Sequence, residues 1–179
     1  MPGPIPGKVT YASQGNGSTS HLSAQMLATQ AGIQLVHVPY RGEGPALVDI
    51  TAGRIDIFIG NISAALRFEK TGQVKFLGVA ATSRSPVAPH VPDAAEIGLP
   101  DLLASAWFGV VAPPGTPDAV IDRINKDIVA VLKLEDVRQK FLEQGAEPQG
   151  QSPAATAQFI KDEEMRWRAV IKSANVTLE

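Results

Sequence analysis

The feature that most constrains the fold is a regular alternation of short apolar segments with segments of helical character. The apolar segments are predicted to be strands and lie at 9–12, 35–38, 55–59 and 74–80. Between them, helices are predicted from Ser18 or Ser20, from a turn around Pro45 to Gly53, and over about 62–70. Because alternating strands and helices form parallel sheets covered on both faces, we predict the α/β class with a parallel-rich sheet.

A small polar loop joins the first predicted strand to the first predicted helix. It has the sequence Ser13-Gln14-Gly15-Asn16-Gly17-Ser18-Thr19-Ser20-His21. A turn of this kind directs backbone N–H groups and hydroxyls toward one point, where the helix N-terminus adds about half a positive charge. The loop lacks the lysine of a P-loop and the third glycine of a dinucleotide fingerprint. It is therefore either an anion site for a carboxylate or phosphate, or an ordinary strand-to-helix turn.

The second half of the chain is predicted to be mainly helical. The loop 82–100 contains four prolines and is expected to pack against the fold, and 107–112 is predicted to be a strand. A helix follows with Thr116 as its N-cap and Pro117 at its first position, and further helices are expected at about 135–144 and 153–174. The first of these helices is expected to bury an apolar stripe formed by Val120, Ile121, Ile124, Ile128, Val131 and Leu132.

Composition excludes several function classes. Sixteen basic and eighteen acidic residues give a net charge of −2, which argues against a nucleic-acid partner. No cysteine is present, and His21, His37 and His90 are scattered, so we expect neither a metal site nor a cofactor. The first seven residues carry neither a charged leader nor an apolar stretch long enough for a signal peptide.

Three polar segments are expected to meet at one edge of the sheet. The loop 13–20, the turn 40–44 and Asn61 each follow a predicted strand. In parallel sheets, ligands bind beyond the carboxyl ends of the strands. We therefore place the candidate site at this edge.

Short motifs along nearly the whole chain carry a further signal. They are Tyr11–His21, His37–Gly42, Gly53–Asp56, Ser83–Pro86, Pro89–Pro92, Glu96–Pro100, Trp107–Gly109, Ala112–Pro117 and Gln144–Pro148. In their order and spacing they resemble the Bug-type periplasmic solute-binding receptors of tripartite tricarboxylate transporters.

The resemblance implies a periplasmic-binding-protein fold of type II, in which two α/β lobes joined by a hinge close on a small carboxylated solute. Residues 7–104 then correspond to the second, ligand-binding lobe. Residues 105–179 correspond to the crossover strand and helices of an incomplete first lobe. A complete member carries a signal peptide and most of its first lobe before the equivalent of Val9, so this chain is expected to hold half a cleft.

The resemblance also implies a set of ligand-binding residues. On one side these are Ser13, Asn16, Gly17, Ser18 and His21, with Tyr40, Arg41 and Gly42 opposite and Asn61 reaching in from the next strand end. Two positions depart from the family pattern, since Gly60 replaces a frequent acid and Arg41 replaces a frequent lysine. Glu43 is an acid that can pair with Arg41 and would weaken an anionic site.

Several of these residues have a purely structural interpretation. His21 is expected to bond to the neighbouring turn, with donation to a solute as the alternative, and Arg41 either grips a carboxylate or pairs with Glu43 or Asp49. Asp56 is expected to bond to backbone. Trp107 and Trp167 are expected to serve packing, and the acidic run 162–164 to be a solvated helix face.

The function implied by the resemblance is capture of a small carboxylate in the periplasm for a membrane permease. An alternative is a truncated receptor remnant that acts as an oligomeric scaffold, because bared apolar helix faces after Pro117 favour a homo-oligomer or a segment-swapped dimer. A hydrolase would need Ser18 or Ser20 with His21 and Asp56. Ser20 and His21 are adjacent on a helix and do not face each other, so we predict no enzyme.

Overall fold

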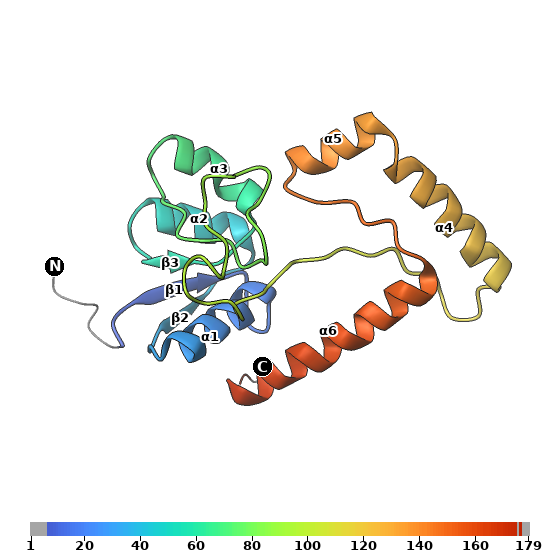
Figure 1. The fold of residues 1–179 in the computed structure, drawn as a ribbon. Coiled ribbons are helices and arrows are strands. Elements are labelled where there is room, and N and C mark those ends of the chain that lie inside the picture. The colour runs from blue at the N-terminus through green and yellow to red at the C-terminus, as the bar shows by residue number, and fades with distance from the viewer. Residues whose placement is uncertain (1–6, 175, 177–179) are drawn as a thin grey trace. The chain divides into compact units, whose positions relative to one another are not determined.

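The computed structural model describes residues 7–174 and 176. The first seven residues, in which we expect no leader, lie almost wholly outside this range. The chain divides into two compact units (Figure 1). The described residues up to Ala106 and from Arg168 onward form one, called the α/β unit, and residues 107–167 form the other, called the helical unit.

The α/β unit is built on a parallel sheet of three strands. These are β1 (Thr10–Ser13), β2 (Val36–Pro39) and β3 (Ile57–Phe58), in the order β2-β1-β3. Tyr11 of the central strand is in register with His37 on one side and Ile57 on the other. The predicted α/β class with a parallel sheet is confirmed.

Three helices alternate with these strands: α1 (Thr19–Ala31), α2 (Glu43–Thr51) and α3 (Ile62–Lys70). Ser18 caps α1, and Gly32 ends it in the left-handed conformation with φ of 63°, which glycine adopts without strain. The chain moves from β1 to β2 and then back past β1 to β3. Since such crossovers are right-handed, α1 and α2 cover opposite faces of the sheet, as Figure 1 shows.

Apolar and polar contacts together hold β1 at the centre of this unit. Ala12, Ala46 and Ile55 form a buried cluster between the sheet and α2. Asp56 accepts hydrogen bonds from the backbone N–H of Thr10 at 2.8 Å and from its hydroxyl at 2.7 Å, which ties β1 to the β3 segment. The prediction that Asp56 bonds to backbone is confirmed.

The segment that follows α3 packs as a loop. Ala88, Val91 and Ala94 are buried, and His90 Nε2 lies 2.8 Å from the Glu69 carboxylate of α3, so the prediction that 82–100 packs against the fold is confirmed. The predicted strand at 74–80 is wrong, since in the described structure only Val79 makes a bridge there, with Asp93. An apolar run becomes a strand only where a neighbouring strand pairs with it.

The helical unit contains α4 (Asp118–Leu132), α5 (Glu135–Glu143) and most of α6 (Pro153–Ser173), which ends in the α/β unit. These helices confirm the predicted ones to within two residues. The cap differs, because the Thr116 hydroxyl donates to the carbonyl of Pro113 and Pro117 takes the N-cap position without a side-chain bond. No helix in the described part of the chain is long and apolar enough to cross a membrane.

Apolar side chains of the helical unit remain accessible. The predicted strand at 107–112 is wrong, because it finds no strand partner among the described residues and Phe108 is 91% exposed. The apolar stripe of α4 is not buried as predicted, and Val120, Ile124 and Val131 are exposed. Trp107 packs edge-on against Phe159 at 5.5 Å, and the Trp167 indole donates to Glu163 at 3.0 Å.

Candidate functional site

The loop after β1 is held by its own hydroxyls. The Ser18 hydroxyl donates to the carbonyl of Gly15 at 2.6 Å and accepts from the His21 N–H at 3.3 Å. The Ser20 hydroxyl accepts from the backbone N–H of Gln14 at 2.8 Å. Gly17 turns the chain with φ of 72°, a backbone conformation that residues other than glycine rarely adopt. The loop is therefore a fixed turn at the N-terminus of α1.

Donors at the end of this loop remain unused. Within the described structure, neither the Asn16 side chain nor the backbone N–H groups of Asn16, Thr19 and Ser20 make a hydrogen bond. Asn16 is exposed. Free N–H groups at a helix N-terminus favour a bound anion.

Two histidines support the loop from beneath. His21 is buried, and its Nδ1 accepts from the N–H of Gly17 at 3.1 Å, which confirms the expected bond to the neighbouring turn. The His21 ring stacks on His37 with centroids 4.0 Å apart, and His37 stacks on Tyr11 at 4.8 Å. His37 Nε2 lies 2.6 Å from the buried Ser13 hydroxyl. Ser13 thus belongs to the support beneath the loop.

Burial keeps this stack neutral. It lowers the pKa of His21, and it lowers the pKa of His37 to about 4 with help from the nearby His21 charge. Our sequence interpretation left His37 out of the candidate site. His37 could be recognised only from its position beside Tyr11 in the neighbouring strand, and that position follows from the order of the strands in the sheet. No group of three or more metal-binding side chains occurs among the described residues.

The loop after β2 lies beside the first loop. The backbone N–H groups of Tyr40 and Gly42 donate to the carbonyls of Ser13 and Gln14 at 3.0 and 3.2 Å. The Tyr40 hydroxyl donates to Asp49 at 2.6 Å, and that bond raises the pKa of Tyr40. The backbone of this loop is thus joined to the β1 loop, whereas the Tyr40 hydroxyl is bonded to α2.

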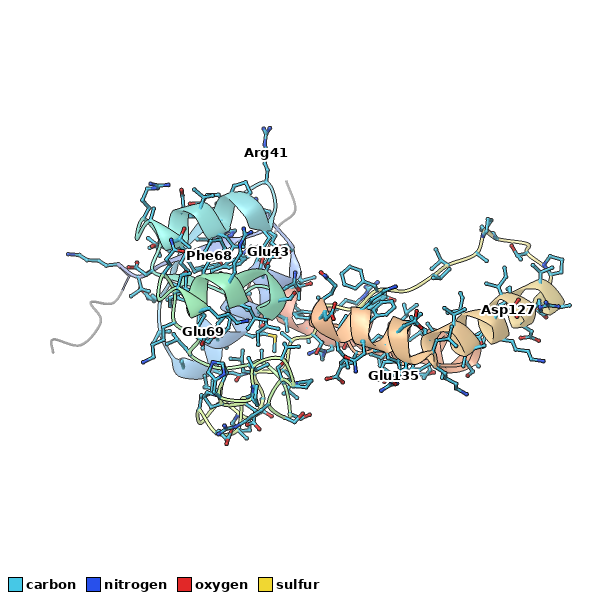
Figure 2. All side chains as sticks on the ribbon, turned by 90° about the horizontal axis from the view of Figure 1, so that it is seen from above. Arg41, Glu43, Phe68, Glu69, Asp127 and Glu135 are labelled. Carbon is cyan, nitrogen blue, oxygen red and sulfur yellow. The ribbon has the colours of Figure 1, made fainter. Side chains whose placement is uncertain are left out.

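Arg41 projects into solvent, away from the ribbon (Figure 2). Neither predicted acidic partner pairs with it. Asp49 binds Arg54, whose guanidinium, together with the Tyr40 hydroxyl, lowers the pKa of Asp49. Glu43 binds Asn61 instead. Within the described residues Arg41 forms no ion pair, so its guanidinium can still receive a carboxylate.

The loop after β3 is fixed by Glu43. One carboxylate oxygen of Glu43 accepts from the backbone N–H of Asn61 at 2.8 Å, and the other accepts from the Asn61 side-chain amide at 2.9 Å. Gly60 leaves the room for this arrangement, since a Cβ there would clash with the Phe58 ring and lie 2.6 Å from Glu43 Oε1.

The structure therefore brings the predicted residues to one edge of the sheet, where some of them hold the loops together and others keep unused donors. In the order β2-β1-β3, the loops after β1 and β3 diverge, which is where ligands bind in open α/β sheets. The hydrolase set is not assembled. Ser20 accepts from Gln14, His21 from Gly17 and Asp56 from Thr10, so no nucleophile–base–acid relay forms.

Comparison with known proteins adds the family. Residues 4–176 match the family described as the tripartite tricarboxylate transporter family receptor. A protein from the tcbD–tcbE intergenic region of Pseudomonas sp. (strain P51) is 38% identical over 167 residues, covering 93% of this chain and 50% of that protein. Protein BugT of Bordetella pertussis is 36% identical over 174 residues, covering 97% of this chain and 53% of BugT.

Solved structures show the same fold. An R. palustris protein with adipate superposes with a TM-score of 0.87 at 34% identity, covering 96% of this chain and 57% of that one. MatC from Rhodopseudomonas palustris with bound malate gives a TM-score of 0.80 at 34% identity, covering 92% and 57%. The chain thus spans about half the length of the two relatives from Pseudomonas sp. and Bordetella pertussis.

Proposed function

Since the chain belongs to the tripartite tricarboxylate transporter receptor family, which is a family of transport receptors and not of enzymes, we propose that it binds a small carboxylated solute. The proposed site is the carboxyl edge of its parallel sheet. A solute carboxylate binds there at the N-terminus of α1 and is held from the neighbouring loop by Arg41.

The observation that carries this proposal is the pattern of used and unused donors in the loop after β1. The hydroxyls of Ser13, Ser18 and Ser20 are spent inside the loop, whereas Asn16 and the first N–H groups of α1 are free of protein acceptors within the described structure. A rigid turn with unused donors needs no rearrangement to receive an anion. Adipate and malate in two similar structures are ligands of this class.

The wider role follows the family. We assign residues 7–104 to the ligand-binding lobe and 105–179 to the strand and helices that belong with a first lobe. Closure of two lobes on the solute in the periplasm would present the receptor to a membrane permease. Ser13 and His21 act as supports in this scheme. Asn16, Gly17, Ser18, Arg41, Gly42 and Asn61 form the solute-facing edge, and Tyr40 contributes through its backbone.

A second candidate role is assembly as an oligomeric scaffold. Phe108, Val110 and Val111 are exposed at 91%, 76% and 83%, which is unusual for a soluble protein surface. We propose a second copy of this chain as the partner, by pairing or by exchange of this segment. A monomer at about 50 µM without dye-accessible apolar surface would overturn this candidate.

The solute proposal is tested by titrating the full chain with adipate and malate in a calorimeter and by NMR, with mass measured on the same sample. We expect saturable binding, and a loss of about fivefold in affinity for Asn16→Ala and for Arg41→Gln. Arg123→Gln, which removes an arginine of α4 that is likewise exposed, is the control and leaves binding unchanged. Absence of saturable shifts with either solute at about 10 mM would contradict the proposal.

A further inference from the structure

The loops after β1 and β3 present opposite chemistry to the proposed site. The β1 loop offers unused N–H donors at the N-terminus of α1. Beside the β3 loop lies the carboxylate of Glu43, which is the first residue of α2 and is bonded to Asn61 at the start of α3. A solute that carries only carboxylates suits the first loop and is repelled by the second.

Asn61 presents an acceptor on this side. Its backbone N–H and its side-chain Nδ2 both donate to Glu43. An amide side chain has two donors on nitrogen and an acceptor oxygen, and Oδ1 of Asn61 makes no hydrogen bond among the described residues. Glu43 at the start of α2 and Asn61 in the β3 loop therefore together offer a carboxylate and an amide oxygen, which are partners for a donor group.

The position of Glu43 is built into the fold. Any side chain at Gly60 would meet the Phe58 ring and the Glu43 carboxylate within 3 Å. Glu43 is only partly exposed, and two N–H groups fix its oxygens. Its carboxylate is thus a fixed group, since a swing away from the site would break both bonds.

No cation among the described residues pairs with the charge of Glu43. Arg41, two residues earlier, extends away from the ribbon, and no ion pair to Glu43 forms within the described residues (Figure 2). Among the functional groups of small solutes, a protonated amine can donate hydrogen bonds both to a carboxylate and to an amide oxygen.

We propose that Glu43 is a specificity-determining residue that selects solutes bearing a protonated amine beside a carboxylate. This inference rests on the proposed function. The solute carboxylate binds at the N-terminus of α1, and its ammonium group faces Glu43 and Asn61 Oδ1. Neighbouring parallel strands lie about 4.8 Å apart, so one small solute can reach the loops after β1 and β3 together.

Three solutes with the same four-carbon skeleton test the proposal, namely succinate, malate and aspartate. They differ at one carbon, which carries hydrogen, hydroxyl or ammonium. We expect the full-length chain to bind aspartate about fivefold more tightly than succinate, with malate between them. In Glu43→Gln, which keeps the size and removes the charge, we expect succinate to tighten and aspartate to weaken until the two are nearly equal.

Glu135→Gln is the matched control, because Glu135 is likewise the first residue of its helix, α5, and bonds to an amide, that of Gln139. It changes the net charge equally and leaves the preference intact. Succinate that binds wild type at least as tightly as aspartate, with a ratio that Glu43→Gln does not change, overturns this inference and leaves the receptor function standing. Failure of all three solutes and of adipate to bind wild type overturns the receptor function itself. The wild-type comparison needs no variant to fold.

Discussion

The α/β unit and the helical unit use similar sequence signals with different results. In the α/β unit, α1 and α2 each pack their apolar faces against the sheet. Tyr11, Ala12 and Ala46 are completely buried there. In the helical unit, α4 has a clear apolar stripe, yet none of its residues is buried. Periodicity and caps thus determine where a helix forms, whereas burial depends on a second surface for the helix to cover.

Removal of a buried ring should distinguish the units most strongly. Tyr11 is fully buried, stacks on His37 and accepts a hydrogen bond from Gln25 at 2.8 Å. Tyr11→Ala is expected to cost about 3–5 kcal/mol of unfolding free energy, because it leaves a cavity under the β1 loop. Phe141→Ala in α5, where the ring is 41% exposed, should cost about 1 kcal/mol or less.

Native-state hydrogen exchange, read separately for amides of each unit, measures both variants. Equal losses for the two variants would show that the helical unit has a core of its own, and the contrast drawn here would fail.

Acid should affect the α/β unit at a higher pH than the helical unit. All three histidines lie in the α/β unit, and burial lowers the pKa of His21 and lowers that of His37 to about 4. Below pH 6.5 the histidines of the unfolded chain bind protons, whereas those of the folded stack stay unprotonated. The free energy of unfolding therefore falls from about pH 6.5 down to about pH 4. Because His37 remains partly exposed, we expect a loss of about 1 kcal/mol.

Urea unfolding at pH 7, 5.5 and 4, with resonances assigned to each unit, checks this. The double variant His21→Gln and His37→Gln should lose most of the dependence between pH 6.5 and 4. A helical unit that weakens in parallel over that window would mean that carboxylates, not the histidine stack, dominate.

The N-caps give a smaller contrast. Ser18 accepts the N–H of His21 and caps α1, whereas the cap of α4 at Pro117 has no side-chain bond. Ser18→Ala should cost about 1 kcal/mol, and Thr116→Ala distinctly less, about 0.3 kcal/mol. Thermal unfolding of the two variants compares them, and a larger loss for Thr116→Ala would restore the role that its sequence position suggested.

The sequence was sufficient where the signal is local. Ser18 and the glycines after α2 and α3 mark their helix ends within a few residues, and the parallel sheet follows from the alternation of elements. The sequence was insufficient where a structural element forms only by pairing with a segment that is distant along the chain. The runs 74–80 and 107–112 have strand composition, but a strand also needs a neighbour with free N–H and C=O groups.

The candidate site shows the same division. Its place at the carboxyl ends of the strands could be predicted, because it depends only on parallel connectivity. The pairing of Glu43 with Asn61 and the stacking of His21 on His37 could not, since each joins residues more than fifteen positions apart through the sheet. The sequence also left two roles open for Arg41, a grip on a carboxylate or a pair with Glu43 or Asp49, because it does not show that Arg54 and Asn61 engage those two acids.

The smallest effect is expected at the surface of α4. Arg123 donates to Asp127 one turn later at 2.9 Å, and the side chains are 77% and 60% exposed. An i,i+4 pair in water contributes only about 0.3–0.5 kcal/mol, and salt screens it. Arg123→Ala should therefore lower the unfolding free energy of the helical unit by no more than this, and the difference should vanish at about 1 M salt. A loss that persists in high salt would mean that the aliphatic part of Arg123 packs against the α4 surface, and the exposed stripe would then be better covered than its side-chain accessibility indicates.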